Sequence, residues 1–330
     1  MLLRSAVVVL NGIRTGSGSV LNQFPRRIAL IPNFQIHWRS AKRSSFQRAR
    51  VESKYSQLKI PFVFTVATGS LCVVGNQHLG KLISPQSKYD GQTLTSWWNS
   101  RPDWMKVYCL ICGSCIAVFA AFRLGSLVSE RYPALWIFMN KYFVTSALPT
   151  SPAASCAQLI LSAFSHINPL HLGINMFILY NVAETMVPEM GKDSFLGAYL
   201  FCAVASGFCS LTYQLSRGHY TGSVGASGAI LGLLGMVMYT HPEYNFYIIF
   251  LPFLAIPARV LMASLITMDL IGVIQGWRFF DHAGHLGGML SGLVWNFIKT
   301  SQEKETGHST QDKGISSILP RLSPEKKDEW

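Results

Sequence analysis

A serine between small residues and a histidine farther along the chain are the two residues whose types predict joint chemistry. Ser227 lies in the sequence Gly225-Ala226-Ser227-Gly228 at the start of one apolar run, and His285 lies at the start of a later one. A hydroxyl is a weak nucleophile at neutral pH and needs a base to accept its proton. Imidazole exchanges protons near neutral pH, so it can take that proton and return it to a leaving amine. The pair predicts a serine hydrolase.

A second group of polar residues lies at the start of an earlier apolar run, at His166, His171 and Asn175. His171 and Asn175 are four residues apart, so on a helix they share one face and lie one turn from each other. We expect these two side chains, with the backbone N–H of Ser227, to stabilise the oxyanion of an acyl-transfer reaction.

Two neighbours of His285 have more than one interpretation. Asp281 precedes His285 by four residues and either orients it as the third member of a triad or caps its helix, where a carboxylate is favoured. The cap is the preferred interpretation. His282 is a rival base, but it lies nearer the end of the apolar run, where we expect it to be in contact with water.

The composition predicts that these residues work inside a membrane. Of the 330 residues 49% are hydrophobic and 13% are charged, with a mean hydropathy of +0.28, which is too apolar for a soluble domain. A helix that crosses a bilayer needs about 20 residues. On this basis seven spans are predicted, at residues 61–74, 105–124, 169–187, 195–215, 224–240, 246–274 and 282–298.

The polar groups described above fall at the starts of the third, fifth and seventh spans. Spans of the same parity run in the same direction, so we expect these groups at one membrane face, around a shared cavity. Small-residue ridges that let helix backbones approach closely run along the fifth and seventh spans, at Gly228, Gly232 and Gly235 and at Gly284, Gly288 and Gly292.

The sixth span is irregular. Pro252 and Pro257 interrupt its helical hydrogen bonds, and Arg259 and Asp269 lie within it. Such backbone and such charges persist at membrane depth only where protein or water shields them. We expect a helix that starts near Pro257 and is preceded by an extended loop.

The first 55 residues predict import into mitochondria. Nine Lys and Arg residues precede Glu52 and no acidic residue does, which is the composition of a transit peptide. The alternative is a secretory signal, because residues 6–10 are apolar. Basic residues before the first span predict that its N-terminal end lies on the matrix side of the inner membrane. The polar tail at 300–330 is expected to be flexible.

Other function classes have weaker support. The net charge of +12 is concentrated in the leader, so we expect no nucleic-acid binding. Cys109, Cys112 and Cys115 are spread around a helix and no fourth soft ligand is near in the sequence, so packing is a better interpretation than a metal site. The chemistry of a serine and a histidine requires no metal or organic cofactor.

At these residues the chain resembles the rhomboid intramembrane serine proteases, and within them the mitochondrial, presenilins-associated rhomboid-like branch. The likeness extends over about residues 97–298. Three motifs carry it: Gly225-Ala226-Ser227-Gly228 for the GxSG motif, His285-Leu286-Gly287-Gly288 for the AHxxG-type helix, and His166, His171 and Asn175 for the second core helix.

The resemblance implies an all-α membrane protein with a six-helix rhomboid core preceded by one extra N-terminal transmembrane helix. The corresponding domain ranges are a leader at 1–55, the extra helix and an interfacial connector at 56–104, the core at 105–299 and the tail at 300–330. It further implies a Ser227–His285 dyad without an acid, His171 and Asn175 in the oxyanion site, and a mobile helix-and-loop gate around the sixth span. The implied substrates are imported single-span membrane proteins with N-terminal anchors, cleaved within the lipid bilayer near small residues.

The chain departs from the family pattern at two positions, and the Trp-Arg pair of the family's first core loop is not evident. Leu231 stands where many bacterial members have a tyrosine that stacks on the catalytic histidine, and Gly284 replaces the alanine before that histidine. The first change removes one support for the His285 ring, whereas the second is mild.

Two other functions stay open at this point. A non-catalytic relative that binds and escorts membrane segments has the same fold, although the presence of both Ser227 and His285 argues against it. A transporter could use His166, His171 and Asp269 as a proton path, but this interpretation lacks an inverted repeat and leaves the Gly-Ala-Ser-Gly sequence unexplained.

Overall fold

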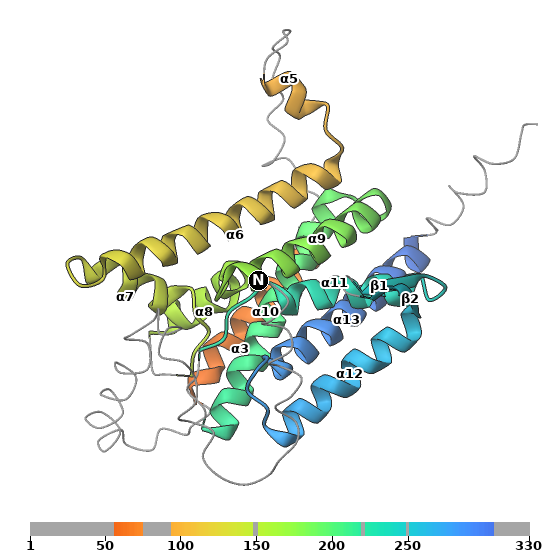
Figure 1. The fold of residues 1–330 in the computed structure, drawn as a ribbon. Helices are drawn as coiled ribbons and strands as arrows, with labels where there is room; N and C mark the ends of the chain where they lie inside the picture. The colour runs from red at the N-terminus through yellow and green to blue at the C-terminus, as the bar shows by residue number, and fades with distance from the viewer. Residues whose placement is uncertain (1–55, 75–93, 148–150, 219–221, 249–250, 307–330) are drawn as a thin grey trace, which may run out of the picture. The chain divides into compact units, whose positions relative to one another are not determined.

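A computed structural model describes the chain in five ranges, at residues 56–74, 94–147, 151–218, 222–248 and 251–306. The predicted leader and most of the predicted connector and tail lie outside these ranges. The described part is mostly helical (Figure 1). In chain order its elements are η3 (Ser56–Leu58), α3 (Lys59–Val74), α5 (Leu94–Asn99), α6 (Asp103–Val128), α7 (Pro133–Tyr142), α8 (Pro152–Leu161), η5 (Ser162–Phe164), α9 (Pro169–Met190), α10 (Lys192–Arg217), α11 (Ser227–Thr240), β1 (Asn245–Ile248), β2 (Leu251–Pro257), α12 (Ala258–Gln275) and α13 (His282–Thr306).

Helix α10 lies at the centre of this bundle and contacts α3, α8, α9, α11 and α13. Its side chains Phe195, Tyr199 and Cys202 are fully or almost fully buried. Helix α13 packs along both α10 and α11, and its Trp295 is completely buried with its ring 5.8 Å from that of Phe201 in α10. The core therefore forms around α10, α11 and α13, which is where the predicted serine and histidine lie.

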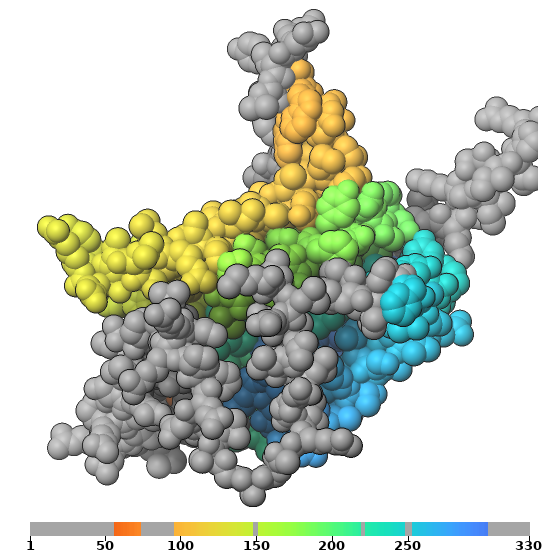
Figure 2. Space-filling model, viewed as in Figure 1, coloured from red at the N-terminus to blue at the C-terminus, as the bar shows by residue number. Residues whose placement is uncertain are grey.

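The outer helices cover this core. Helix α6 runs along the surface and packs on α9 (Figure 2), where Tyr108 meets Tyr180 edge-on with ring centroids 5.4 Å apart. On its other side α6 exposes Leu124 and Leu127. Helix α3 packs on α10 so closely that a methyl group at Gly69 would lie 2.8 Å from the ring of Phe201. Exposed apolar side chains on such helices are what a lipid environment accommodates.

Four helices of the described residues have the length and apolar composition to cross a membrane. They are Ser56–Val73, α6, α10 and α12, and two shorter apolar helices are Pro152–Phe164 and α11. A mostly helical protein with several helices able to cross a membrane is thereby confirmed. The arrangement of one extra helix and six core helices stays a prediction, because α9, α11 and α13 are not among the four.

The sixth predicted span is corrected by the structure. Its first part forms an antiparallel hairpin of β1 and β2, in which Asn245 pairs with Pro257, so the fold is not purely α-helical. The helix starts at Ala258, directly after Pro257, as predicted. Proline has no N–H to donate and is tolerated in an edge strand. The expected extended segment is therefore correct, but its pairing into a hairpin was not foreseen.

Two short helices, α7 and α8, lie between α6 and α9 where the sequence predicted no span. Each begins with a proline at its first position, which is favourable for a helix N-terminus. The segment between them forms a single antiparallel bridge with the segment before α11, because Thr145 and Ser223 exchange backbone hydrogen bonds of 3.0 and 2.9 Å. This region thereby anchors the segment that leads into Ser227.

Candidate active site

The segment before α11 holds Ser227 at the first position of that helix. Gly225 has φ +140°, a conformation that side chains rarely adopt, and its N–H donates to the Ser162 carbonyl at 3.0 Å. The backbone then turns into α11 at Ala226, whose carbonyl accepts the first helical hydrogen bond, from Ile230. Gly225 therefore allows the sharp turn that places Ser227 at the N-terminus of α11.

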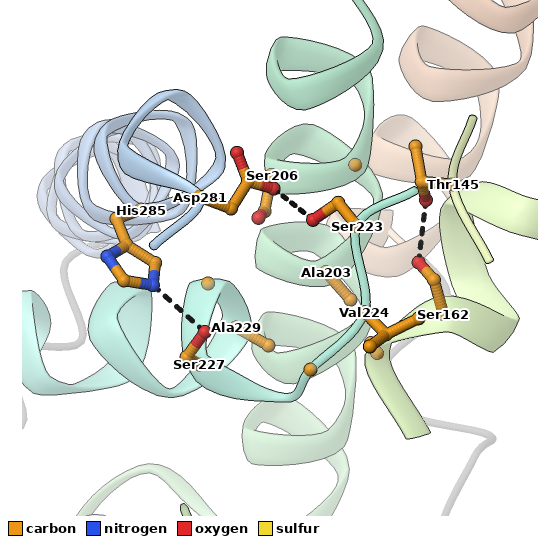
Figure 3. A pocket seen from close by; sticks show the side chains of 14 residues that line it. Thr145, Ser162, Ala203, Ser206, Ser223, Val224, Ser227, Ala229, Asp281 and His285 are labelled. Atoms are coloured by element: carbon orange, nitrogen blue, oxygen red, sulfur yellow. Dashed lines mark hydrogen bonds between the residues drawn. The ribbon is translucent and has the colours of Figure 1, made fainter. Parts of the chain in front are cut away.

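Ser227 and His285 meet, although 58 residues separate them in the chain. The Ser227 Oγ lies 3.0 Å from His285 Nε2, within hydrogen-bonding distance (Figure 3). Both residues are partly buried, with the imidazole 12% exposed. This is the arrangement that a hydroxyl and its general base require.

Asp281 caps the helix that carries His285. Its Oδ1 accepts from the Gly284 N–H at 3.0 Å and its carbonyl accepts from the His285 N–H at 2.9 Å. The other carboxylate oxygen accepts a hydrogen bond from the Ser223 hydroxyl (Figure 3). The predicted cap is confirmed, and the Ser223 contact ties the start of α13 to the segment that leads into α11.

His171 also lies near the serine, beside Gly225. A methyl group at Gly225 would be 2.9 Å from the Cε1 of His171 and 3.5 Å from the Oγ of Ser227, so the ring edge and the hydroxyl flank the same glycine. The start of α9 is fixed by Asn168, whose side chain accepts from the His171 N–H at 2.8 Å. The start of α9 thus places the His171 ring close to Ser227.

Asn175 is buried one turn farther along α9, 4% exposed, and its amide donates to the His171 carbonyl at 2.8 Å. One of its two N–H donors is therefore used within the helix. The ring of His166 lies 5.1 Å from that of His171, in the segment that precedes α9. Burial, and secondly the neighbouring His171, lower the pKa of His166 to about 4.

The surroundings of the second nitrogen of His285 differ from expectation. Asp269 of α12 is completely buried, and its Oδ1 lies 3.3 Å from His285 Nδ1 and 2.7 Å from His282 Nδ1. His282 is only 2% exposed, so the prediction that water surrounds it is wrong. A carboxylate thus lies beside the His285 imidazole, where the resemblance implies a dyad without an acid. Asp269 stands out in the sequence as a charge in an apolar run, but only the packing of α12 on α13 identifies its partners.

A small pocket lies beside Ser227, between the middle of α10 and the starts of α11 and α13 (Figure 3). Hydroxyl groups dominate its polar lining, and Ser162 accepts from the Thr145 hydroxyl at 2.8 Å. The polar lining residues besides Ser227 and His285 are Thr145, Ser162, Ser206, Ser223 and Asp281. The pocket has the polar character that water or a polar group next to the nucleophile needs.

Comparison with known proteins gives consistent matches. The family model described as a Rhomboid domain matches residues 153–302. The chain is 33% identical over 247 residues to the human "Presenilin-associated rhomboid-like protein, mitochondrial", a match that covers 69% of this chain and 62% of the human protein. The rat protein of the same name is 31% identical over 291 residues, with 76% of this chain and 74% of the rat protein covered.

Another relative is "Rhomboid protein 1, mitochondrial" of Saccharomyces cerevisiae, 32% identical over 213 residues, with 63% of this chain and 57% of the yeast protein covered. The chain spans less than two thirds of the length of the human and yeast relatives. The matches and the membrane-competent helices characterise a multi-pass mitochondrial membrane protein. The resemblance drawn from the sequence is confirmed, and the chain belongs to the rhomboid family.

Proposed function

We propose that this chain is an intramembrane serine endopeptidase of the mitochondrial inner membrane. Ser227 is the nucleophile and His285 the general base and acid. The observation that carries the proposal is the 3.0 Å contact between Ser227 Oγ and His285 Nε2 at the start of two closely packed helices. It is supported by the motif around the serine and by the membership of the rhomboid family.

The proposed reaction has two stages. His285 Nε2 takes the hydroxyl proton as the Ser227 oxygen attacks the carbonyl carbon of a peptide bond, and the imidazolium then protonates the leaving amine. An ester between Ser227 and the N-terminal part of the substrate is left. Water attacks this ester, His285 accepts its proton, and the collapse of the second intermediate releases the acid and restores the hydroxyl.

The negative charge on the carbonyl oxygen is held by donors around Ser227. The serine is the first residue of α11, so its backbone N–H has no partner within the helix and points toward the helix start. His171 approaches from α9, and Asn175 has one amide N–H beyond the one used in the helix. We assign these three donors to the oxyanion, because fixed dipoles aimed at a developing charge give much of the stabilisation in such enzymes.

The proposed substrates are single-span membrane proteins with N-terminal anchors, cleaved where their helix unwinds near small residues. The site is proposed to open to water on the matrix side. The basic residues that precede α3 support this orientation, since flanks rich in Lys and Arg stay on the inner side of a membrane, here the matrix side.

The test is cleavage of a reporter with one transmembrane segment and an N-terminal anchor by the purified full chain in liposomes. Ser227→Ala and His285→Ala are each expected to lower kcat by roughly 10³-fold or more, since the nucleophile and its base act as a unit. The matched control is Ser114→Ala in α6, because Ser114 donates to its own helix at Leu110 and lies away from the pocket. Cleavage by Ser227→Ala at the wild-type rate would remove the proposal.

A further inference from the structure

Asp269 is a carboxylate buried inside an apolar helix. It lies in α12, one of the helices able to cross a membrane, and is 0% exposed. Ionisable side chains at such depth are costly and are usually functional. Its contacts therefore need an explanation beyond packing.

Within the described part of the chain, the carboxylate pairs with two imidazoles of the next helix and with no Lys or Arg side chain. His282 Nδ1 lies 2.7 Å and His285 Nδ1 3.3 Å from the same oxygen, Oδ1. A carboxylate oxygen only accepts hydrogen bonds, so both rings must donate to it through Nδ1. For neutral His285 this leaves the lone pair on Nε2, the atom that lies 3.0 Å from the Ser227 hydroxyl.

The fold makes room for this arrangement. Gly272 lies one turn after Asp269 in α12, and a methyl group there would overlap the ring of His282. On its other sides His282 is enclosed by Trp277 and Phe279, with ring centroids 5.8 and 5.1 Å away. His282 is thereby held against α12, where its hydrogen bond fixes the carboxylate next to His285.

We propose that Asp269 is a positioning residue for His285 and that His282 holds Asp269 in place. The carboxylate selects the tautomer in which Nε2 of His285 accepts the Ser227 proton, and it stabilises the imidazolium that forms, without itself taking up a proton. This inference rests on the proposed function. It adds a buried acid to the Ser–His dyad that the family resemblance implies, supplied by a different helix from either of its members.

Asp269→Asn tests the proposal, because it keeps the shape and removes the charge. In triad proteases the equivalent change costs roughly 10⁴-fold in kcat, and the longer 3.3 Å contact here predicts a smaller loss of roughly 10- to 10²-fold, with KM little changed. The rate of reaction with a fluorophosphonate probe should fall in parallel, since both reactions need the same activated hydroxyl. Asp269→Glu, which keeps the charge, should recover part of this loss.

A purely structural role gives a different pattern. If the Asp269–His282 pair only fastened α12 to α13, then His282→Gln and Asp269→Asn would lower the melting temperature equally and reduce activity equally. Positioning predicts that His282→Gln costs much less in kcat than Asp269→Asn at the same folded fraction. Asp103→Asn is the matched control, since this exposed carboxylate lies at the start of α6 and pairs with Lys106 and Lys192.

The possible results distinguish a failure of the Asp269 positioning role from a failure of the proposed protease function. Suppose that the wild-type chain reacts with the probe and Ser227→Ala does not. If the kcat and probe reaction rate of Asp269→Asn are then within twofold of wild type, the positioning role alone is overturned. A kcat loss in Asp269→Asn no greater than in His282→Gln, at equal folded fraction, would overturn it too. Equal probe reaction in wild type and Ser227→Ala would instead remove the proposed protease.

Discussion

Gly288 of α13 lies directly against the backbone carbonyl of Gly228 in α11. A methyl group at Gly288 would overlap that carbonyl, and the same relation recurs one turn on between Gly292 and Gly232. Helices α11 and α13 are therefore in backbone contact along one edge. Since Ser227 precedes the first of these glycines and His285 lies in the turn before Gly288, this contact sets the distance between hydroxyl and imidazole.

Gly288→Ala is predicted to push α11 and α13 apart. Overpacking of this kind typically costs about 1–3 kcal/mol, so we expect a lower melting temperature and a loss of kcat larger than the unfolded fraction explains. The measurements are thermal unfolding in detergent and reporter cleavage below the melting temperature. Gly113→Ala in α6 is the control, because a methyl group there meets nothing within 4 Å. Equal behaviour of the two variants would show that the contact does not control the site.

Gly225→Ala is predicted to disable the site with little effect on the rest of the fold. The residue has φ +140°, and the added methyl group would press against the ring of His171 at 2.9 Å. We expect the Ser227 hydroxyl to turn away, so the probe should react at least about tenfold more slowly, by comparison with the cost of misplacing a reacting group. Probe labelling at the wild-type rate would contradict this account of the turn.

His171→Ala is predicted to slow catalysis more than Asn175→Ala. Loss of one oxyanion donor costs roughly 10²- to 10³-fold in kcat. His171 flanks the serine, whereas one donor of Asn175 is already used by the His171 carbonyl. Steady-state cleavage should therefore show the larger kcat decrease for His171→Ala, with KM less affected. The reverse order would transfer the main oxyanion role to Asn175.

The stability of the protein is predicted to fall in acid through His166. Its pKa is about 4 in the fold, against 6.5 for an ordinary histidine, because burial disfavours the charged form. Below about pH 6.5 the unfolded chain binds a proton that the folded chain does not bind until about pH 4. The contribution of neutral His166 to the free energy of unfolding is therefore complete above about pH 6.5 and is lost as the pH falls towards about 4. Melting temperatures across this range should decline less steeply in His166→Gln than in wild type. Parallel curves would assign the acid sensitivity to other groups.

Local patterns in the sequence predicted much of the site. The small residues around Ser227 and the spacing of His171 and Asn175 are short-range features, and the apolar runs are long enough to indicate helices. The helix start at Ala258 follows from Pro257 in the same way. These features depend on neighbours in the chain, so they can be predicted without the tertiary structure.

The remaining features depend on contacts between distant segments. Asp269 and His285 are 16 residues apart on different helices, and only the reversal between α12 and α13 brings them together. His282 is expected to be wet from its place near the end of an apolar run, but Trp277 and Phe279 enclose it. The hairpin of β1 and β2 was missed because its two strands lie inside one apolar run, where periodicity does not separate strand from helix.

The central claim is that the hydroxyl of Ser227 is the activated nucleophile. The most direct measurement is reaction of the purified full chain with a fluorophosphonate, followed by digestion and tandem mass spectrometry to locate the adduct. We predict one adduct, on Ser227, that disappears in Ser227→Ala and is strongly reduced in His285→Ala. An adduct on another serine such as Ser206 or Ser223, or none in a chain that cleaves the reporter, would contradict the account.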